Sequence, residues 1–231
     1  MAAKDDALSR RGFMGDVGRA ALLVPLSVPL VAAAPDVLAR GYREPAQGEW
    51  DLSWVKRLEA ATDRAIFDWP GMGSTADPII LEIAARYLDN CAAAYGGNGF
   101  RPGVVLNIRT TATAAGLSDD LWERFSLGTE TSAVDPDTNE PARRNPFWRR
   151  AKDTPAGIPD LAELMQRGCI VLICDFALGH LSERVGKRIG RDPKEVHQEL
   201  RAGRIPGAFI VPSGIFGLVR SQNAGCGLVR L

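Results

Sequence analysis

Short apolar runs alternate with longer amphipathic segments over residues 50–231, and this alternation predicts the fold class. Runs typical of strands lie at residues 65–68, 103–108, 169–174, 208–211 and 226–231. Helical spacing of apolar positions predicts helices over residues 50–65, 77–95, 118–125, 159–168 and 214–224, with two more beginning near 175 and 192. Asp77 and Pro78 are the expected N-cap and first residue of one of these helices. Strands that alternate with helices favour a three-layer α/β fold around a mostly parallel sheet.

The first 39 residues have the pattern of a twin-arginine export signal followed by a linker. Arg10 and Arg11 are adjacent and precede an aromatic residue, and a mostly apolar stretch follows over residues 20–34. That stretch is too short and too interrupted by proline to be a comfortable membrane span. We therefore expect export to the periplasm, with contact to the membrane only through the signal.

The rest of the chain divides into a short helical extension, residues 40–61, and one α/β domain, residues 62–231. A domain of this length is large enough to bury a sizeable core. The chain contains 28 basic and 28 acidic residues. This balance gives no reason to expect nucleic acid as a partner.

Polar and reactive side chains follow the predicted strands at the points where the strands end. In open α/β sheets, ligands bind outside the carboxyl ends of the strands. The candidate site therefore combines Cys174 as the reactive group with four substrate-binding candidates, which are Asp68, Arg109, Thr110 and Ser213. An arginine fork with hydroxyl groups suits a small anion.

Cys174 is the candidate on which the function depends most. It ends a buried strand just before a helix, whose partial positive charge lowers the pKa of a thiol. The adjacent Asp175 acts in the opposite direction, so we expect only a modest reduction of the pKa from about 8.5. Position alone leaves a reactive thiol and a small core side chain equally open.

The other cysteines carry less chemistry. Cys169 and Cys174 are separated by about 16 Å along one strand and point to opposite faces, so they cannot share a metal ion. We therefore expect no metal site. Cys91 lies in the middle of a predicted helix, and we assign its side chain to the hydrophobic core of the protein. Cys169 and Cys226 each begin a strand, and a disulfide between them requires those strands to be neighbours.

Two further segments have residue patterns that could belong to ligand sites. The glycines of residues 71–73 match a dinucleotide fingerprint only formally, because they precede the predicted helix instead of opening it. We interpret them as a flexible turn and expect no cofactor. The segment 143–150 holds four arginines around two aromatic residues, which is compatible with an oxyanion site but more typical of a solvated loop anchored by its aromatic side chains.

Residues 62–231 resemble the DsrE/DsrF-like sulfur-relay superfamily, in particular an exported branch with twin-arginine signals. The resemblance rests on VVLNIRTTATAAGLSDDLWERFSLG, DPDTNEPARRNPF, IVLICDFALGHL and EVHQELRAGRIPGAFIVPSGIFGLVRSQNAGCGLVRL. It implies an α/β sandwich with a five-stranded, mainly parallel sheet, often assembled as a homo-oligomer. It also implies a persulfide-carrying role for Cys174, which lies at the matching strand end. Members of the exported branch often carry a histidine near the tip of the second strand, where this chain has residues 107–109 without one.

Three functions remain open at this point. The first is a periplasmic sulfurtransferase-like carrier that takes sulfur from a small sulfur-containing molecule such as thiosulfate. The second is a protein that binds a small anion or apolar ligand at the same edge without chemistry. The third is an assembly subunit whose function lies in contacts between copies.

Overall fold

The computed structural model describes residues 50–96, 100–149 and 158–230. The predicted export signal with Arg10 and Arg11, the first part of the 40–61 extension and Arg150 lie outside these residues. None of the helices in the described ranges has the length and apolar character needed to cross a membrane.

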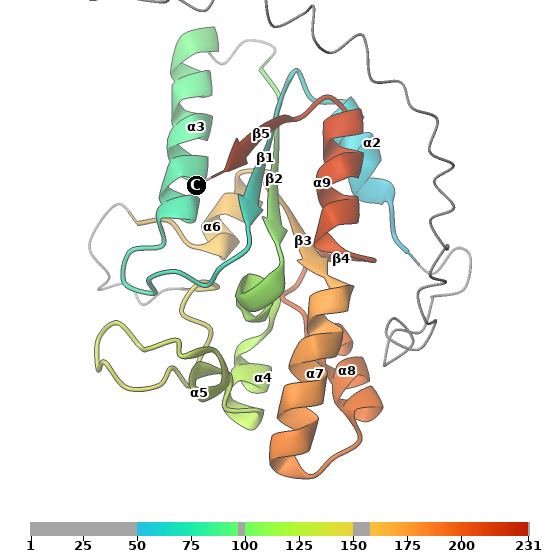
Figure 1. Cartoon of the computed structure of the whole chain (residues 1–231). Helices are drawn as coiled ribbons and strands as arrows, with labels where there is room; N and C mark the ends of the chain where they lie inside the picture. Colours follow the sequence, from blue (N-terminus) through green and yellow to red (C-terminus); the bar gives the residue numbers. More distant parts are fainter. Residues whose placement is uncertain (1–49, 97–99, 150–157, 231) are drawn as a thin grey trace, which may run out of the picture. The chain divides into compact units, whose positions relative to one another are not determined.

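Within the described residues the centre of the fold is a five-stranded sheet whose strand pairs are all parallel. The strands are β1 (Asp63–Trp69), β2 (Pro102–Ile108), β3 (Ile170–Cys174), β4 (Phe209–Val211) and β5 (Gly227–Arg230). Their order across the sheet is β4-β3-β2-β1-β5 (Figure 1). The predicted strands are confirmed to within two residues at their ends.

Helices cover both faces of the sheet, so the predicted three-layer α/β sandwich is confirmed. Helices α2 (Ser53–Glu59) and α9 (Gly214–Asn223) lie on one face, and α3 (Ile79–Tyr95) and α6 (Leu161–Gln166) lie on the other (Figure 1). Successive strand side chains point to opposite faces. The two faces accordingly have separate apolar clusters, with Ile66 on the α9 side and Phe67 on the α3 side.

The remaining helical segments follow the carboxyl ends of β2 and β3. They are the 3₁₀ helix η1 (Thr110–Gly116), α4 (Asp119–Arg124), α5 (Leu127–Thr131), α7 (Asp175–Ile189) and α8 (Pro193–Ala202). Helix α7 ends where Gly190 adopts a left-handed conformation, and Asp192 caps α8 by accepting the Lys194 N–H. The sequence pattern did not predict η1 or α5.

Two predicted helix bounds are wrong. The helix expected over 50–65 is only α2, because the chain turns after Glu59 and the Thr62 N–H already bonds to the carbonyl of Arg101 beside the sheet. Asp77 does not cap α3, which begins at Ile79 after Pro78. The first-turn N–H of Leu81 bonds to the Pro78 carbonyl instead of to a side chain.

Candidate functional site

Cys174 lies at the carboxyl end of β3 and is the N-cap of α7. Its Sγ accepts a hydrogen bond from the Ala177 N–H at 3.3 Å, and the Gly214 N–H also faces it. The Phe176 N–H instead donates to the carbonyl of Pro212 at 3.2 Å. Gly214 is the first residue of α9, so the sulfur lies where the positive ends of two helices meet. The side chain is 4% exposed.

The pKa of the Cys174 thiol is raised from its ordinary value, so the expected modest reduction is wrong. Burial is the largest cause, because the charged thiolate loses its hydration. Hydrogen bonds from the Ala177 and Gly214 N–H groups lower the pKa, the charge of Asp175 raises it, and the Phe176 N–H lowers it. The helix ends therefore offset only part of the cost of burial.

The carboxylate of Asp175 is buried and held on the α8 side of the fold. Its Oδ1 lies 3.0 Å from Nε2 of His197, and its Oδ2 lies 3.5 Å from Nη1 of Arg201. Asp175 therefore has partners of its own and does not cap α7, a role that the Cys174 sulfur takes instead.

Beside the cysteine, Asp68 and Arg109 form a bidentate ion pair between β1 and the end of β2. Nε and Nη2 of Arg109 each donate to one carboxylate oxygen of Asp68 at 2.7 Å. The Asp68 side chain is 2% exposed and that of Arg109 is 15% exposed. The pKa of Arg109 is raised, first by the hydrogen bond to Asp68 and, with a smaller contribution, by the charge of a Cys174 thiolate. Arg109 is thus a cation within electrostatic reach of the sulfur.

Asn107 joins this pair to α9, and sequence reasoning missed it. Its Nδ2 donates to Oδ1 of Asp68 at 3.3 Å and to the carbonyl of Gly214 at 3.1 Å. It is fully buried, and its Oδ1 has no hydrogen-bond partner among the described residues. The available signal was one amide in an otherwise apolar strand, on the same face as Arg109 two residues later.

The other two predicted site residues use their hydroxyl groups on the backbone. Ser213 caps α9 by accepting the Phe216 N–H at 3.1 Å. Thr110 donates to the carbonyl of Pro70 and has a left-handed backbone with φ of +49°. A positive φ is uncommon for threonine and marks a constrained backbone at this edge. The structure thus places Arg109 at the end of the strand next to that of Cys174, with Asp68 as its partner on the far side, and uses Ser213 and Thr110 to shape the loops around them.

The remaining cysteines are buried and free. Cys169 and Cys226 lie at the amino ends of β3 and β5, and β1 and β2 separate these two strands, so they are not placed to form a disulfide. Burial raises the pKa of Cys169 to about 12 and that of Cys226 to about 11. No cluster of three metal-ligating side chains occurs in the part of the chain that the structure describes.

The loop that carries the arginine cluster, residues 143–149, is anchored to the core by two buried side chains. Phe147 is fully buried with its ring edge-on to Trp69, and Asn145 donates to the carbonyls of Ala115 and Leu117. Arg143 and Arg144 are exposed on the outside of this loop. Residues 143–149 therefore form an exposed loop with buried anchors, and Arg143 and Arg144 also line a cavity beside α4.

Two cavities among the described residues lie away from Cys174 and the Asp68–Arg109 pair. One lies beside β4 and α8, and the other lies between α4 and the 135–144 loop. The candidate site itself is a charged and largely buried edge of the sheet. Comparison of the chain with protein-family models and with curated proteins found no match.

Cys174 is expected to be alkylated in the native protein before Cys169 and Cys226, because burial raises the pKa of these two thiols to about 12 and about 11. Its rate should keep rising with pH through about pH 9, because a thiol with a raised pKa remains protonated where an ordinary cysteine already forms thiolate. Timed labelling with iodoacetamide, followed by peptide mapping, measures both the order and the profile. Faster labelling of Cys169 or Cys226, or a rate at Cys174 that levels off below about pH 8, contradicts the expectation.

Proposed function

We propose that this chain is an exported, DsrE/DsrF-like protein that carries a sulfur atom on Cys174. The main support is the set of donors around one sulfur atom. Two backbone N–H groups, those of Ala177 and Gly214 from two helix starts, face Sγ, and the Arg109 guanidinium lies within electrostatic reach. Such a cradle stabilises a sulfur anion, whether it is a thiolate or the terminal sulfur of a persulfide.

The transfer needs no cofactor and no outside oxidant. With thiosulfate as the donor, the Cys174 thiolate attacks the outer sulfur, the S–S bond of thiosulfate breaks, and sulfite leaves with the electron pair. The products are the Cys174 persulfide anion and sulfite. A thiolate of the acceptor then attacks the outer sulfur of the persulfide, becomes a persulfide itself and releases the Cys174 thiolate.

Exposed apolar side chains border the sulfur and favour a protein as the acceptor. Phe176 and Ile215 are about half exposed or more, and each belongs to the first turn of one of the two helices that face Sγ. Apolar side chains at the rim of a site suit contact with another protein. We include assembly with further copies of the chain in the proposal, since these side chains suit that contact equally.

A second candidate function is binding of a small anion at this edge without covalent chemistry. The 4% exposure of Cys174 and its raised pKa favour this alternative, because both slow a thiol nucleophile. The paired Arg109 and the helix starts would then be the anion-binding groups.

Treatment with thiosulfate or polysulfide separates the two functions. Sulfur carriage predicts a mass increase of one sulfur atom in the intact wild-type protein, complete loss of the adduct in Cys174→Ser, and its retention in Cys169→Ser. The second variant is the matched control, because Cys169 is equally buried at the opposite edge of the sheet. A wild-type protein that takes up no sulfur, or an adduct that persists in Cys174→Ser, rules out carriage by Cys174.

Export through the twin-arginine pathway is a separate part of the proposal. Replacing both Arg10 and Arg11 with lysine is expected to leave the precursor in the cytoplasm, because the pathway recognises the arginine pair. Cell fractionation with immunoblotting measures the distribution. Undiminished periplasmic accumulation of the double variant would remove the assignment without affecting the chemistry proposed for Cys174.

A further inference from the structure

A cavity of about 810 Å³ lies between α4 and the loop of residues 135–144, beyond the carboxyl end of β2 (Figure 1). Its volume is within the range of small-molecule sites, which combine apolar surface with a few polar groups. The apolar part of the lining is formed by Trp122, Pro141 and Ala142. The rest of the lining is polar and includes charged side chains of both signs.

The backbone of the cavity wall is held in place by contacts within the fold. Oδ1 of Asp135 accepts the Thr138 N–H at 3.1 Å, and the Ala142 N–H donates to the carbonyl of Ala133 at 2.9 Å. Gly128 of α5 lies so close to the loop that an added Cβ would be 2.3 Å from the carbonyl oxygen of Ala142. A ligand therefore does not bear the entropic cost of ordering this loop.

Arg143 and Arg144 are the two cations of the lining. Directly after them, Asn145 is buried and donates to the carbonyls of Ala115 and Leu117, so the backbone that carries the two arginines is fixed. Both side chains are exposed, and neither guanidinium has a hydrogen bond or an ion pair with another described residue. Each guanidinium therefore has all five of its N–H donors open to a ligand.

Glu123 of α4 and Glu140 of the loop bring negative charge to the same cavity. Within the described ranges, no ion pair joins either carboxylate to Arg143 or Arg144 or to any other cation. The cavity thus holds positive and negative groups apart from each other. A ligand that carries both charges can pair with both kinds of group at once.

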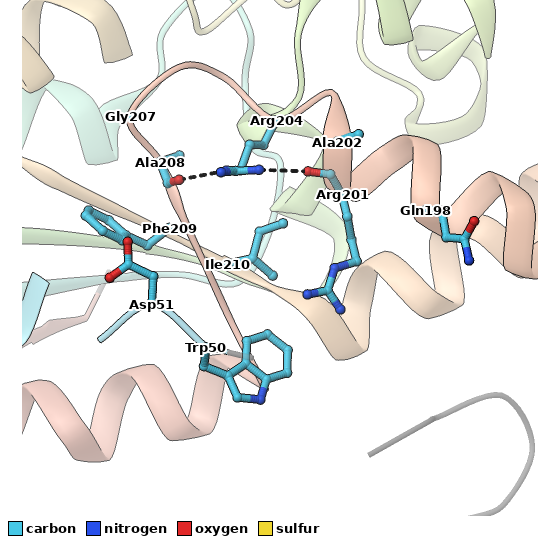
Figure 2. A pocket seen from close by; sticks show the side chains of 10 residues that line it. All are labelled: Trp50, Asp51, Gln198, Arg201, Ala202, Arg204, Gly207, Ala208, Phe209 and Ile210. Carbon is cyan, nitrogen blue, oxygen red and sulfur yellow. Dashed lines mark hydrogen bonds between the residues drawn. The ribbon is translucent and has the colours of Figure 1, made fainter. Parts of the chain in front are cut away.

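The arginines of the cavity beside β4 differ, because they already have partners. Arg204 donates to the carbonyls of Ala208 and Arg201 at 3.0 and 3.3 Å (Figure 2). Nη1 of Arg201 lies 3.5 Å from Oδ2 of the buried Asp175. Unpaired guanidinium groups therefore distinguish the cavity beside α4.

We propose that the cavity beside α4 binds a small zwitterion with an apolar side chain, of the kind that an aromatic amino acid represents. The carboxylate pairs with the guanidinium groups of Arg143 and Arg144, whose forks match two oxygens. The ammonium group pairs with Glu123 and Glu140, and the side chain lies against the apolar part of the lining. The site goes beyond the sulfur chemistry proposed for Cys174, which does not line this cavity.

Titration of the full chain with para-fluorophenylalanine, followed by fluorine NMR, tests the site. We expect saturable binding with a Kd of about 1 mM or tighter. Two analogues each keep one charge, because N-acetyl-para-fluorophenylalanine lacks the ammonium group and para-fluorophenylalanine amide lacks the carboxylate. Each analogue should bind about tenfold more weakly than the amino acid.

Variants of the lining test the location. The double variant Arg143→Gln with Arg144→Gln should weaken binding by about tenfold or more. Arg149→Gln is the matched control, because Arg149 is an exposed arginine of the same loop that lies 5.4 Å from the centre of the Trp148 ring and does not line the cavity. It should leave Kd unchanged. Thr129 is exposed on the cavity wall, so Thr129→Trp fills the space without entering the core and should abolish binding.

The proposal is overturned if the wild type shows no saturation at about 10 mM, or if either analogue binds as tightly as the amino acid. It is equally overturned if the double arginine variant or Thr129→Trp binds like the wild type.

Discussion

Asp68→Ala is expected to lower the free energy of unfolding by about 3–5 kcal/mol. The substitution removes a carboxylate that is 2% exposed and accepts two hydrogen bonds of 2.7 Å from Arg109. It leaves the guanidinium largely buried without its counter-charge and takes an acceptor from Asn107. Breaking a buried pair on one side costs far more than the net stabilisation that the intact pair provides. Urea denaturation monitored by fluorescence measures the change.

The matched control is Asp63→Ala at the start of the same strand. Asp63 accepts one hydrogen bond from the exposed Tyr95 hydroxyl at 3.1 Å, and its removal should cost about 1 kcal/mol or less. Replacing the pair together, as Asp68→Leu with Arg109→Met, should recover much of the loss because no buried charge remains. If Asp68→Ala and Asp63→Ala lower the free energy of unfolding equally, then the Asp68–Arg109 pair is not buried as described.

Gly214→Ala is expected to lower the free energy of unfolding by about 1–3 kcal/mol and to raise the pKa of the Cys174 thiol further. A Cβ at this position would lie 2.6 Å from Cβ and Cδ of Arg109, which is closer than van der Waals contact allows. Helix α9 must then move away from the sheet, and the Gly214 N–H moves away from the sulfur whose pKa it lowers. The alkylation profile of Cys174 should shift to higher pH, and urea denaturation should show the loss of stability.

Gly179→Ala in α7 is the control for this substitution. The added Cβ would lie in open space outside the helix's own backbone, so the change should stabilise the helix by up to about 1 kcal/mol. The dependence of Cys174 alkylation on pH should stay as in the wild type. If Gly214→Ala leaves both the stability and the profile like those of the wild type, then α9 is not packed against Arg109.

The sequence was sufficient to predict the layers and the edge of the sheet at which the candidate site lies. Parallel strands place all their carboxyl ends together, so Asp68, Arg109 and Cys174 could be grouped before any strand order was known. The apolar runs of β1 to β3 located those ends to within one residue. Local patterns carry this information because a buried parallel strand is apolar on both faces.

What the sequence did not predict depends on contacts between distant segments. Helix α9 approaches Arg109 and Asn107 so closely that it requires glycine at 214 and 217. Nothing near these glycines in the sequence specifies that they pack against strand β2. The predicted direction of the pKa shift of Cys174 was wrong for the same reason. The helix dipole is visible in the sequence, whereas the burial that outweighs it is a property of the packed edge.

Strand β5 has a consequence for the order of folding. Ala65 of β1 pairs with Gly227 of β5, so this pair closes a loop that contains nearly the whole domain. Contacts between such distant segments bear the largest loop-closure entropy and form late. Arg230 of β5 lies 4.0 Å from Asp68, so the last strand to join brings the final positive charge to the buried carboxylate. The charged edge around Cys174 is therefore completed only when β5 has paired with β1. A partly folded chain in which β5 is still unpaired has the Cys174 thiol but lacks the contact of Arg230 with Asp68.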